Sequence, residues 1–332
     1  MELLNIRDLT KHFDVRRAIG GQKQVLKAVD GVSFSIDDDN VTALVGESGC
    51  GKSTVARLVL RLVSPTSGSV LFRGRDIFGF GTKELKAFRK SVQIIFQDPF
   101  ASLNPRRTVF DTVSEPLVIH KLAPRAEMKG RVTDILEMVG LGPEVLYRYP
   151  HEFSGGQRQR ICIARALAVS PELIVADEPL SALDVSIQAQ ILNLLQDLKR
   201  RLKISFLFIS HDLRVVQYVS DRVGVMYLGK IVEYAKTEEL FQVPFHPYSG
   251  VLLASAPKII TRQKSTDSDS SLLTPHSSRP VDFGDVPSPI NIPSGCPFHP
   301  RCPKRFDPCA RIVPELKEKD GRRVACHLWN PY

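Results

Sequence analysis

Short apolar runs alternate with amphipathic stretches over the first hundred residues of the chain. The runs "GVSFSI", "VTALV" and "SVQIIF" have the length and the β-branched content of strands. A helical spacing of apolar residues begins at Lys52, directly after a glycine-rich turn. Strands that alternate with helices are typical of α/β layers, so the pattern predicts an α/β core at the front of the chain.

The pattern changes between about residues 104 and 170. In "TVFDTVSEPLVIHKL", "RAEMKGRVTDILEMVG" and "GQRQRICIARALAV", apolar residues recur at spacings of three and four, as they do in amphipathic helices. Strand-like runs then return as "ELIVADE", "ISFLFIS" and "RVGVMYL", with the helical stretches "SIQAQILNLLQDLKRRL" and "DLRVVQYVS" between them. We therefore expect one domain over residues 1–257, interrupted by a helical subdomain at about 104–170.

The last quarter of the chain differs in composition from the rest. Residues 258–285 are rich in Ser, Pro and charged residues and have too few apolar residues to form a core, which predicts a flexible linker. Residues 286–332 carry four of the six cysteines. We interpret this tail as a small cysteine-rich C-terminal domain.

Composition and charge narrow the class of protein only a little. The 332 residues are 43% hydrophobic, and their net charge of +9 is spread along the chain, as on an ordinary solvated surface. No stretch reaches the roughly 20 apolar residues of a membrane helix, and the first residues lack the apolar core of a secretory signal. We therefore expect a cytoplasmic protein, in which clustered cysteines are more often metal ligands or redox groups than disulfides.

The stretch "LVGESGCGKST" has the spacing of a phosphate-binding loop between a strand and a helix. Gly46 is followed by four residues and then by Gly51, Lys52 and Ser53. Glycines let backbone N–H groups surround a β-phosphate, Lys52 spans the β- and γ-phosphates, and Ser53 offers its hydroxyl to Mg²⁺. The ATP-binding loop is expected to comprise Gly46, Glu47, Ser48, Gly49, Cys50, Gly51, Lys52, Ser53 and Thr54.

Two carboxylates follow the buried strand "LIVA". Asp177 stands at the carboxyl end of this strand, where open α/β sheets place their ligand-binding groups, and is expected to hold the Mg²⁺ shell through water. Glu178 comes next and, because side chains alternate along a strand, projects differently, towards a water in line with the γ-phosphate. We therefore predict that Glu178 is the general base. In a sequence that lacked the phosphate loop, the same Asp–Glu pair could equally be part of an exposed acidic loop.

The stretch "FSGGQRQRICIARAL" resembles the signature of ABC-type ATPases. The resemblance implies a P-loop NTPase fold with a mixed β core, an inserted helical subdomain and, in this chain, a small cysteine-rich C-terminal extension. It also implies that two such domains face each other head to tail. In that arrangement Ser154, Gly155, Gly156 and Gln157 of one domain close over the ATP of the other, and Asp184 in "PLSALD" couples the two sites across the dimer.

The same resemblance assigns three residues that would be weak signals alone. It implies that Phe13 stacks on adenine, that Gln97 touches Mg²⁺ and the attacking water, and that His211 in "FISHD" contacts the γ-phosphate. By itself, such a Phe is more often in a core, such a Gln on the surface and such a His structural. Because every catalytic position of the family is present, with Glu178, His211 and Gln97 as the catalytic group, we expect this chain to hydrolyse ATP itself.

Further stretches resemble the ATP-binding subunits of oligopeptide and dipeptide importers, in particular the F-type subunit, over essentially the whole chain. They are "QDPFASLNPRRTV", "YPHEFSGGQRQRI", "PFHPYSGVLLASAP" and "GDVPSPINIPSGCPFHPRCP". The resemblance implies a heterodimer with a sister ATPase subunit, bound peripherally at the cytoplasmic face of the cell's inner membrane. It further implies two membrane permease subunits and an external solute-binding protein.

Two alternatives to peptide import remain at this point. A transporter of the same type carries nickel chelates, glutathione or sugars, and the sequence does not choose among these solutes because the ATPase never touches its cargo. A nucleic-acid-linked ABC ATPase has only the net charge in its favour, and the short helical insert argues against it. We therefore expect no nucleic-acid partner.

The four cysteines of the tail are separated by five, six and sixteen residues; they are Cys296, Cys302, Cys309 and Cys326. The close Cys pair that is typical of a structural zinc site is absent, although His299 and His327 could complete a mixed zinc shell. Four thiolates suit an iron–sulfur cluster. The tail also resembles that of peptide-import ATPases, some of which hold a [4Fe-4S] cluster on four cysteines. This resemblance implies such a cluster here, with zinc or plain reduced thiols as the alternatives.

Overall fold

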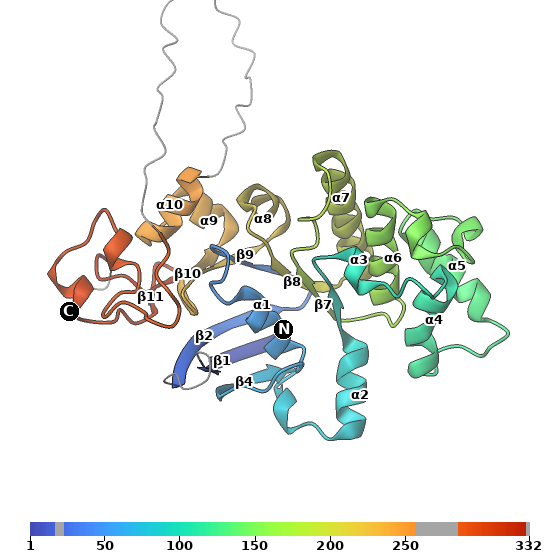
Figure 1. Cartoon of the computed structure of the whole chain (residues 1–332), viewed down its shortest axis with the longest axis horizontal. Helices are drawn as coiled ribbons and strands as arrows, with labels where there is room; N and C mark the ends of the chain where they lie inside the picture. The colour runs from blue at the N-terminus through green and yellow to red at the C-terminus, as the bar shows by residue number, and fades with distance from the viewer. Residues whose placement is uncertain (17–22, 256–284, 330–332) are drawn as a thin grey trace, which may run out of the picture.

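A computed structural model describes residues 1–16, 23–255 and 285–329 of the chain (Figure 1). The predicted flexible linker at 258–285 lies outside these residues, except for its last position. Within the described ranges, no helix is both long enough and apolar enough to cross a membrane.

The centre of the molecule is an eight-stranded sheet with the strand order β11-β12-β10-β9-β3-β8-β7-β6. The strands from β9 to β6 run parallel to one another, whereas β10, β12 and β11 pair antiparallel. Every residue of "VTALV" and of "SFLFI" is buried, as expected for strands covered on both faces. The strands are β3 (Val41–Val45), β6 (Val92–Ile95), β7 (Leu173–Asp177), β8 (Ser205–Ile209), β9 (Arg222–Tyr227), β10 (Lys230–Lys236), β11 (Lys317–Lys319) and β12 (Arg322–Val324).

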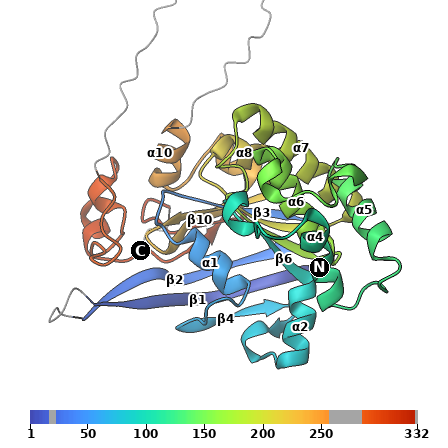
Figure 2. The ribbon, with the colours of Figure 1, turned by 45° about the vertical axis from the view of Figure 1, so that its right-hand side comes forward.

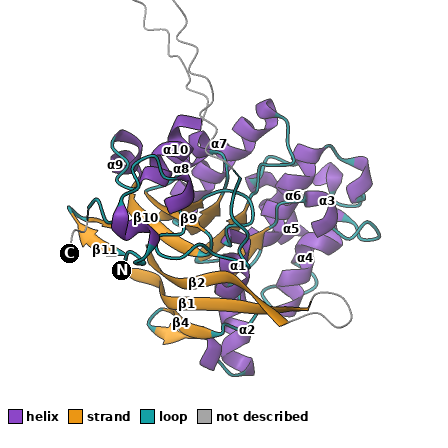
Figure 3. Cartoon of the chain, turned by 60° about the vertical axis from the view of Figure 1, so that its left-hand side comes forward, coloured by secondary structure: helices purple, strands orange, loops and turns teal. Residues whose placement is uncertain are grey.

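A second, antiparallel sheet has the strand order β2-β1-β4-β5 and forms a separate group of strands in Figure 3. The long strands β1 and β2 pair along their whole length, with several shifts of register between them. Their apolar residues share one core with the first helix and with one face of the central sheet. The strands are β1 (Glu2–Arg16), β2 (Lys23–Asp37), β4 (Ser67–Phe72) and β5 (Arg75–Asp76).

The helix α1 (Lys52–Val59) lies between the two sheets (Figure 2). Four helices of the described residues cover the opposite face of the central sheet. There Ala43 and Val45 of β3 belong to a second hydrophobic core, which these helices share. The covering helices are α7 (Val185–Leu202), α8 (Leu213–Val219), α9 (Thr237–Gln242) and α10 (Pro247–Ser255). The chain also forms α2 (Thr82–Ser91) and the 3₁₀ turns η1 (Ile77–Gly79), η2 (Pro143–Val145), η3 (Pro150–Glu152), η4 (His299–Arg301) and η5 (Asp307–Ala310).

The stretch predicted as a helical subdomain, residues 104–170, contains three α-helices, and a fourth lies just before it; all are grouped at the right of Figure 1. Helix α6 packs against the other three and against α7, so it links this group to the α/β core. Thr108 and Asp111 form a capping box that begins α4, and a similar box begins α6. The four helices are α3 (Pro99–Ser102), α4 (Val109–Ile119), α5 (Met128–Met138) and α6 (Gly155–Leu167).

The C-terminal tail is joined to the core by strand pairing, at the left of Figure 1. Val324 and Arg323 of β12 pair with Glu233 and Tyr234 of β10, so β12 and β11 extend the central sheet. Phe298 of the tail is completely buried in the same core as the helices. The tail therefore packs as a continuation of the central sheet, and its description as a domain of its own stays a prediction.

Candidate active site

The loop between β3 and α1 is held in place by its glycines. Gly46 and Gly51 have φ values of 151° and 110°, and a Cβ on them would collide with the carbonyl oxygens of Met226 and Ala28. Gly49 also has a positive φ, of 79°, but open space lies beside it. Thus the first and last glycines are required by packing against β9 and β2, while the middle of the loop stays accessible.

Lys52 places its ammonium group inside this loop. Its side chain is buried, and Nζ donates hydrogen bonds to the carbonyl oxygens of Gly46 at 2.8 Å and Glu47 at 3.1 Å. Helix α1 starts here without any side-chain cap, so its first N–H groups remain available to an anion. Of the other predicted loop residues, Ser48 is exposed and Thr54 lies in the first turn of α1. The arrangement is suited to binding phosphate groups.

Two of the predicted magnesium ligands, one on α1 and one at the end of β7, are in contact. Ser53 Oγ donates a hydrogen bond to Asp177 Oδ1 at 3.0 Å. Burial raises the pKa of Asp177, and the neighbouring Glu178 raises it further. A hydroxyl beside a carboxylate is the kind of oxygen donor set that Mg²⁺ prefers, so these residues fit a magnesium site.

Three predicted catalytic residues meet at a single carboxylate oxygen. Glu178 Oε2 accepts a hydrogen bond from Gln97 Nε2 at 3.1 Å and lies 3.2 Å from His211 Nδ1. The three residues follow the carboxyl ends of the neighbouring strands β6, β7 and β8. Glu178 is largely buried, with 17% of its side chain exposed, whereas His211 is 60% exposed. The carboxylate is therefore fixed from both sides at the mouth of the site.

The backbone of Glu178 adopts an unusual conformation. Its φ is 48°, in the left-handed region that non-glycine residues seldom occupy. Its N–H donates to the carbonyl oxygen of Ile209 at 3.0 Å, which keeps the end of β7 against β8 through this turn. Strained residues of this kind concentrate at functional sites, because the surrounding structure must hold them in place.

Phe13 lies on β1, opposite Leu26 of β2. The ammonium group of Lys11 is 5.0 Å from the centre of its ring. The phenyl ring is half-buried. Its stacking on adenine remains a prediction.

The residues predicted to act across a dimer lie at the start of α6. Ser154 Oγ accepts from the N–H of Gln157 at 3.4 Å, and Gln157 Oε1 accepts from the N–H of Ser154 at 3.1 Å. A Cβ on Gly156 would lie 2.5 Å from Ile187 Cγ2 on α7, and one on Gly155 would lie 3.4 Å from Leu183 Cδ2. Gly156 thus has a packing role within the chain, whatever its role across a dimer.

The loop that contains Asp184 lies beside this helix end. Asp184 is exposed at the N-terminus of α7. The next residue, Val185, has 82% of its surface exposed. Leu183, one residue before, lies against Gly155. Helix α6 and this loop therefore form one continuous surface that includes an exposed apolar side chain.

Sequence reasoning missed two residues that contact the phosphate loop. The N–H of Glu47 donates to the hydroxyl of Tyr248 at 3.0 Å, and the Glu47 carboxylate accepts two hydrogen bonds of 2.8 Å from Arg301. Both residues lie in stretches, "PFHPYS" and "CPFHPRCP", that entered the sequence analysis only through their resemblance. Arg301 is 254 positions from Glu47, and no local pattern predicts a pair at that separation.

Three of the four tail cysteines are buried in the structure. The N–H of Cys296 donates to the carbonyl oxygen of Cys309 at 2.8 Å, and burial raises the pKa of the Cys296 thiol to about 12, with smaller contributions from Cys326, Cys309 and Cys302. Even so, the described part of the chain holds no group of three His, Cys, Asp or Glu side chains placed to bind a metal ion.

The two histidines that could complete a mixed zinc shell each lie beside a backbone carbonyl oxygen. His299 Nδ1 lies 3.0 Å from the carbonyl oxygen of Cys296, and His327 Nε2 lies 2.9 Å from that of Ile312. One ring nitrogen of each histidine is therefore within hydrogen-bond reach of a backbone carbonyl oxygen, a contact that metal-binding histidines also make.

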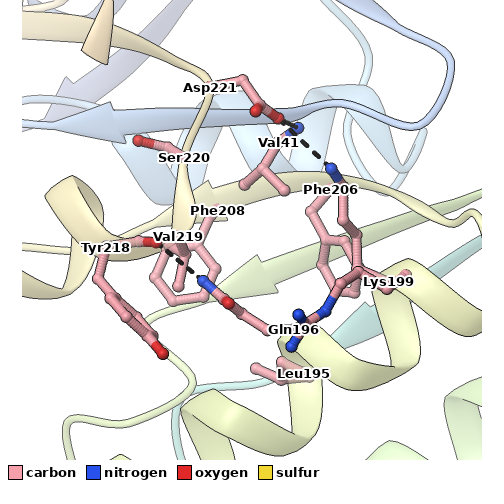
Figure 4. Close-up of a pocket in the computed structure, with 11 residues that line it drawn as sticks. Val41, Leu195, Gln196, Lys199, Phe206, Phe208, Tyr218, Val219, Ser220 and Asp221 are labelled. Atoms are coloured by element: carbon pink, nitrogen blue, oxygen red, sulfur yellow. Dashed lines mark hydrogen bonds and ion pairs between the residues drawn. The ribbon is translucent and has the colours of Figure 1, made fainter. Parts of the chain in front are cut away.

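A cavity of about 230 Å³ lies at the opposite ends of the parallel strands (Figure 4). It is lined by residues of α7 and α8 and by Val41, where β3 begins. Gln196 Nε2 donates across it to the carbonyl oxygen of Tyr218 at 2.8 Å, and Asp221 accepts from the N–H of Val41 at 2.7 Å. Because the phosphate loop follows the other end of β3, this cavity is separate from the candidate active site.

A phosphate loop, a Ser–Asp pair and a fixed carboxylate at adjacent strand ends define a nucleotide-binding protein of the P-loop class. The family described as "ABC transporter" matches residues 29–181. The family described as "Oligopeptide/dipeptide transporter, C-terminal region" matches residues 232–309. The oligopeptide transport ATP-binding protein AppF of Bacillus subtilis (strain 168) is 49% identical over 331 residues, which cover 99% of this chain and 98% of that protein. The chain therefore belongs to the ATP-binding proteins of the oligopeptide/dipeptide ABC transporter family.

Solved structures of ABC cassettes share the fold. The cassette MJ0796, in a dimeric post-hydrolysis state bound to ADP and Pi, is similar with a TM-score of 0.63 and 27% identity, over 70% of this chain and 98% of that chain. The protein cbiO1 from Clostridium perfringens, part of the cbiONQ transporter complex, has a TM-score of 0.62 and 29% identity, over 73% and 91% of the two chains. The predicted α/β P-loop fold of the ABC type is thus confirmed.

Proposed function

We propose that this protein is the ATP-hydrolysing subunit that energises import of oligopeptides or dipeptides through a membrane ABC transporter. The observation that carries the proposal is the meeting of Gln97 and His211 at the Glu178 carboxylate, beside the phosphate loop. The name of the AppF relative supports a peptide as the solute. Nickel chelates and glutathione are the alternative cargoes.

The geometry supports a direct in-line hydrolysis. Lys52 and the free N–H groups of α1 hold the phosphates, and bound Mg²⁺ would neutralise charge on the β- and γ-oxygens. Glu178 accepts a proton from the attacking water as that water's oxygen bonds to the γ-phosphorus and the bond to the β–γ bridging oxygen breaks. Gln97 and His211 orient the carboxylate and the water. Glu178 is well suited to this role because both neighbours hold it on the same oxygen.

We propose further that two ATPase subunits close head to tail around ATP, with a sister subunit as the partner. Ser154, Gly155, Gly156 and Gln157 would then meet the γ-phosphate of the partner's nucleotide, and Asp184 would lie at the contact. Asp184 and Val185, which has 82% of its surface exposed, leave this surface open to a partner.

The link from Gln97 to α6 offers a route from the nucleotide to the membrane subunits. Three residues after Gln97, the ring of Phe100 is 59% exposed, and the guanidinium of Arg158 lies 3.8 Å from its centre. Arg165 of α6 donates to the carbonyl oxygen of Ser102 at 2.7 Å. We propose that α3 and α6 move together and push on two permease subunits at the cytoplasmic face of the membrane. An external solute-binding protein would deliver the peptide.

For the tail we propose, on the family resemblance, that the four cysteines hold a [4Fe-4S] cluster with a structural role. The hydrogen bond of 2.8 Å from the N–H of Cys296 to the carbonyl oxygen of Cys309 brings two of the four cysteines together and supports the proposal. Because no three candidate ligands are grouped in the described residues, the side chains would rotate when the cluster binds. Iron and sulfide analysis after anaerobic purification tests this, and folded protein without metal would exclude the cluster. Zinc in the same preparation would favour the alternative.

The function is tested with the complete transporter in liposomes. We expect ATP-dependent uptake of labelled di- and oligopeptides that requires the sister subunit, the permeases and the solute-binding protein. Uptake of a nickel chelate or glutathione instead would reassign the cargo. Tight binding of DNA duplex with a steep salt dependence would favour the nucleic-acid alternative.

A further inference from the structure

The C-terminal tail reaches the phosphate loop through one buried ion pair. Nη1 and Nη2 of Arg301 donate to the two carboxylate oxygens of Glu47, each at 2.8 Å. The pair is bidentate, which fixes both the distance and the orientation of the two groups. Glu47 is the second residue of the loop, directly after Gly46. The ion pair therefore joins the tail to the nucleotide site itself.

Arg301 is held in a cage of aromatic rings. Only 9% of its side chain is exposed, and its guanidinium carbon lies 5.9 Å from the ring centre of Tyr227 and 5.8 Å from that of Phe298. The Tyr227 hydroxyl accepts a third hydrogen bond from Arg301, at 3.4 Å. Tyr227 also packs on Tyr248, with ring centres 4.6 Å apart. The guanidinium thus has little freedom to leave Glu47.

Glu47 is anchored at three points, each by a different part of the protein. Its carboxylate is bound by Arg301 of the tail, its N–H by the hydroxyl of Tyr248 on α10, and its carbonyl oxygen by Lys52 of α1. Two of the three anchors come from residues beyond the ATPase motifs. The shape of the loop at this position therefore depends on the C-terminal part of the chain.

The charge of Glu47 also matters for the ligand. An unpaired carboxylate in a phosphate-binding loop would repel the triphosphate, and burial would strengthen that repulsion because the local dielectric is low. Arg301 removes this repulsion by pairing with the carboxylate. Both the positive charge of Arg301 and its bidentate contact with Glu47 should therefore favour the binding of ATP.

We propose that Arg301 is a positioning residue for ATP. By pairing with Glu47 it neutralises the charge of that carboxylate and holds the phosphate loop in the shape that binds nucleotide. Arg301 acts through Glu47 and does not itself take part in the chemistry. The inference rests on the proposed function, in that ATP binds at this loop. It gives the tail a role in nucleotide affinity that does not depend on any metal.

The test compares ATP binding and turnover in full-length variants. In Arg301→Met the Glu47 carboxylate loses its arginine partner. We expect the Kd and the KM for ATP to rise by about tenfold or more, a change within the usual range for coupled sites. The kcat at saturating ATP should change far less. In the double variant Arg301→Met with Glu47→Gln, the repelling charge is gone, so much of the affinity should return. The matched control is Arg311→Met, which removes an exposed tail arginine paired with Asp307 and should leave Kd unchanged.

Two results would overturn the inference. Unchanged ATP affinity in Arg301→Met would show that the ion pair does not shape the loop. Equal loss of affinity in the single and double variants, together with a lowered melting temperature, would indicate a merely structural role. Lys52→Ala keeps the two hypotheses separate, because it abolishes ATP binding if the loop is the nucleotide site. If Lys52→Ala binds ATP normally, the proposed function fails as well.

Discussion

The hydroxyl of Ser53 donates a hydrogen bond of 3.0 Å to the carboxylate of Asp177, although 124 positions separate the two residues. Ser53 lies in the first turn of α1 and Asp177 ends β7, so the contact brings the phosphate loop and the Asp177–Glu178 pair to one edge of the sheet. The next residue, Glu178, is thereby set beside the same loop. This juxtaposition is what makes a hydrolytic site of motifs that are distant in sequence.

Replacing Glu178 with Gln should stop turnover without preventing ATP binding. The amide keeps the size of the side chain but cannot accept the proton of the attacking water, so kcat should fall by about 100-fold or more. Steady-state ATPase assays measure the loss, and binding of a fluorescent ATP analogue measures the retained affinity. Light scattering should show that ATP then keeps the dimer closed. Normal hydrolysis by the variant would remove Glu178 from its role.

Ser154 allows a test of the dimer that spares the fold. Asp caps a helix as well as Ser does, so Ser154→Asp should keep the thermal stability of the protein within about 0.5 kcal/mol. Its negative charge would face the γ-phosphate of the partner's ATP, and ATP-driven dimerisation should be lost. Ser154→Asn is the control, since it also caps the helix but carries no charge. Dimerisation and ATPase activity that survive in Ser154→Asp would contradict the head-to-tail arrangement.

Gly156 combines a packing role with a predicted contact across the dimer, and the two are separable. In Gly156→Ala the new methyl group would crowd Ile187 Cγ2, which should lower the free energy of unfolding by about 1–3 kcal/mol. Adding Ile187→Ala removes that atom and should restore part of the stability. Chemical denaturation gives both values. If the double variant regains stability but not ATP-driven dimerisation, the glycine is also needed at the interface; recovery of both would limit its role to packing.

His246 should make the protein less stable in mild acid. Its side chain is buried, and burial lowers its pKa from 6.5 to about 3. Between these two values the unfolded chain binds a proton that the folded chain does not. Stability conferred by the neutral ring is therefore lost as the pH falls below about 6.5, by at most about 1.4 kcal/mol per pH unit.

The variant His246→Asn isolates this effect. Nδ1 of His246 accepts a hydrogen bond of 3.0 Å from the N–H of Tyr248, and the Asn oxygen is placed to accept the same bond. The variant keeps Glu233, which accepts from the N–H of residue 246, so other titrations cancel in the comparison. Urea unfolding at pH 7 and pH 5 should show a smaller loss for the variant than for the parent protein. Equal losses would show that His246 is not the titrating group.

The local motifs could be predicted from the sequence because short segments determine them. The loop from Gly46 to Ser53 lies between a buried strand and a helix, in an order that the sequence shows directly. Asp177 ends a strand whose other residues form one short buried run. Parallel sheet topology brings the carboxyl ends of these strands together, and Gln97, Glu178 and His211 lie there; their catalytic roles stay predictions. Their shared contact at one oxygen needed the structure, because side-chain geometry is not encoded in spacing.

Two features could not be predicted from the sequence pattern. Of the antiparallel sheet, "GVSFSI" within β2 was predicted as a strand, but β1 and its pairing with β2 and β4 were not, because register shifts near Leu9 and Lys11 make that pairing irregular. The pair of Glu47 and Arg301 was missed for a different reason. It depends on the tail folding back over the core, and no periodicity relates positions so far apart.

The pairing of β12 with β10 has a consequence for the behaviour of the protein in a crowded cell. A bare β10 would present a row of unsatisfied backbone groups along a mostly buried, apolar strand, which is a template onto which strands of other molecules add. The short hairpin that covers it is polar and exposed on its outer strand β11, where Lys317 and Glu318 face solvent. We expect the hairpin of β11 and β12 to oppose fibre-like self-association, so forms truncated before Lys317 should precipitate well before they lose the ability to fold.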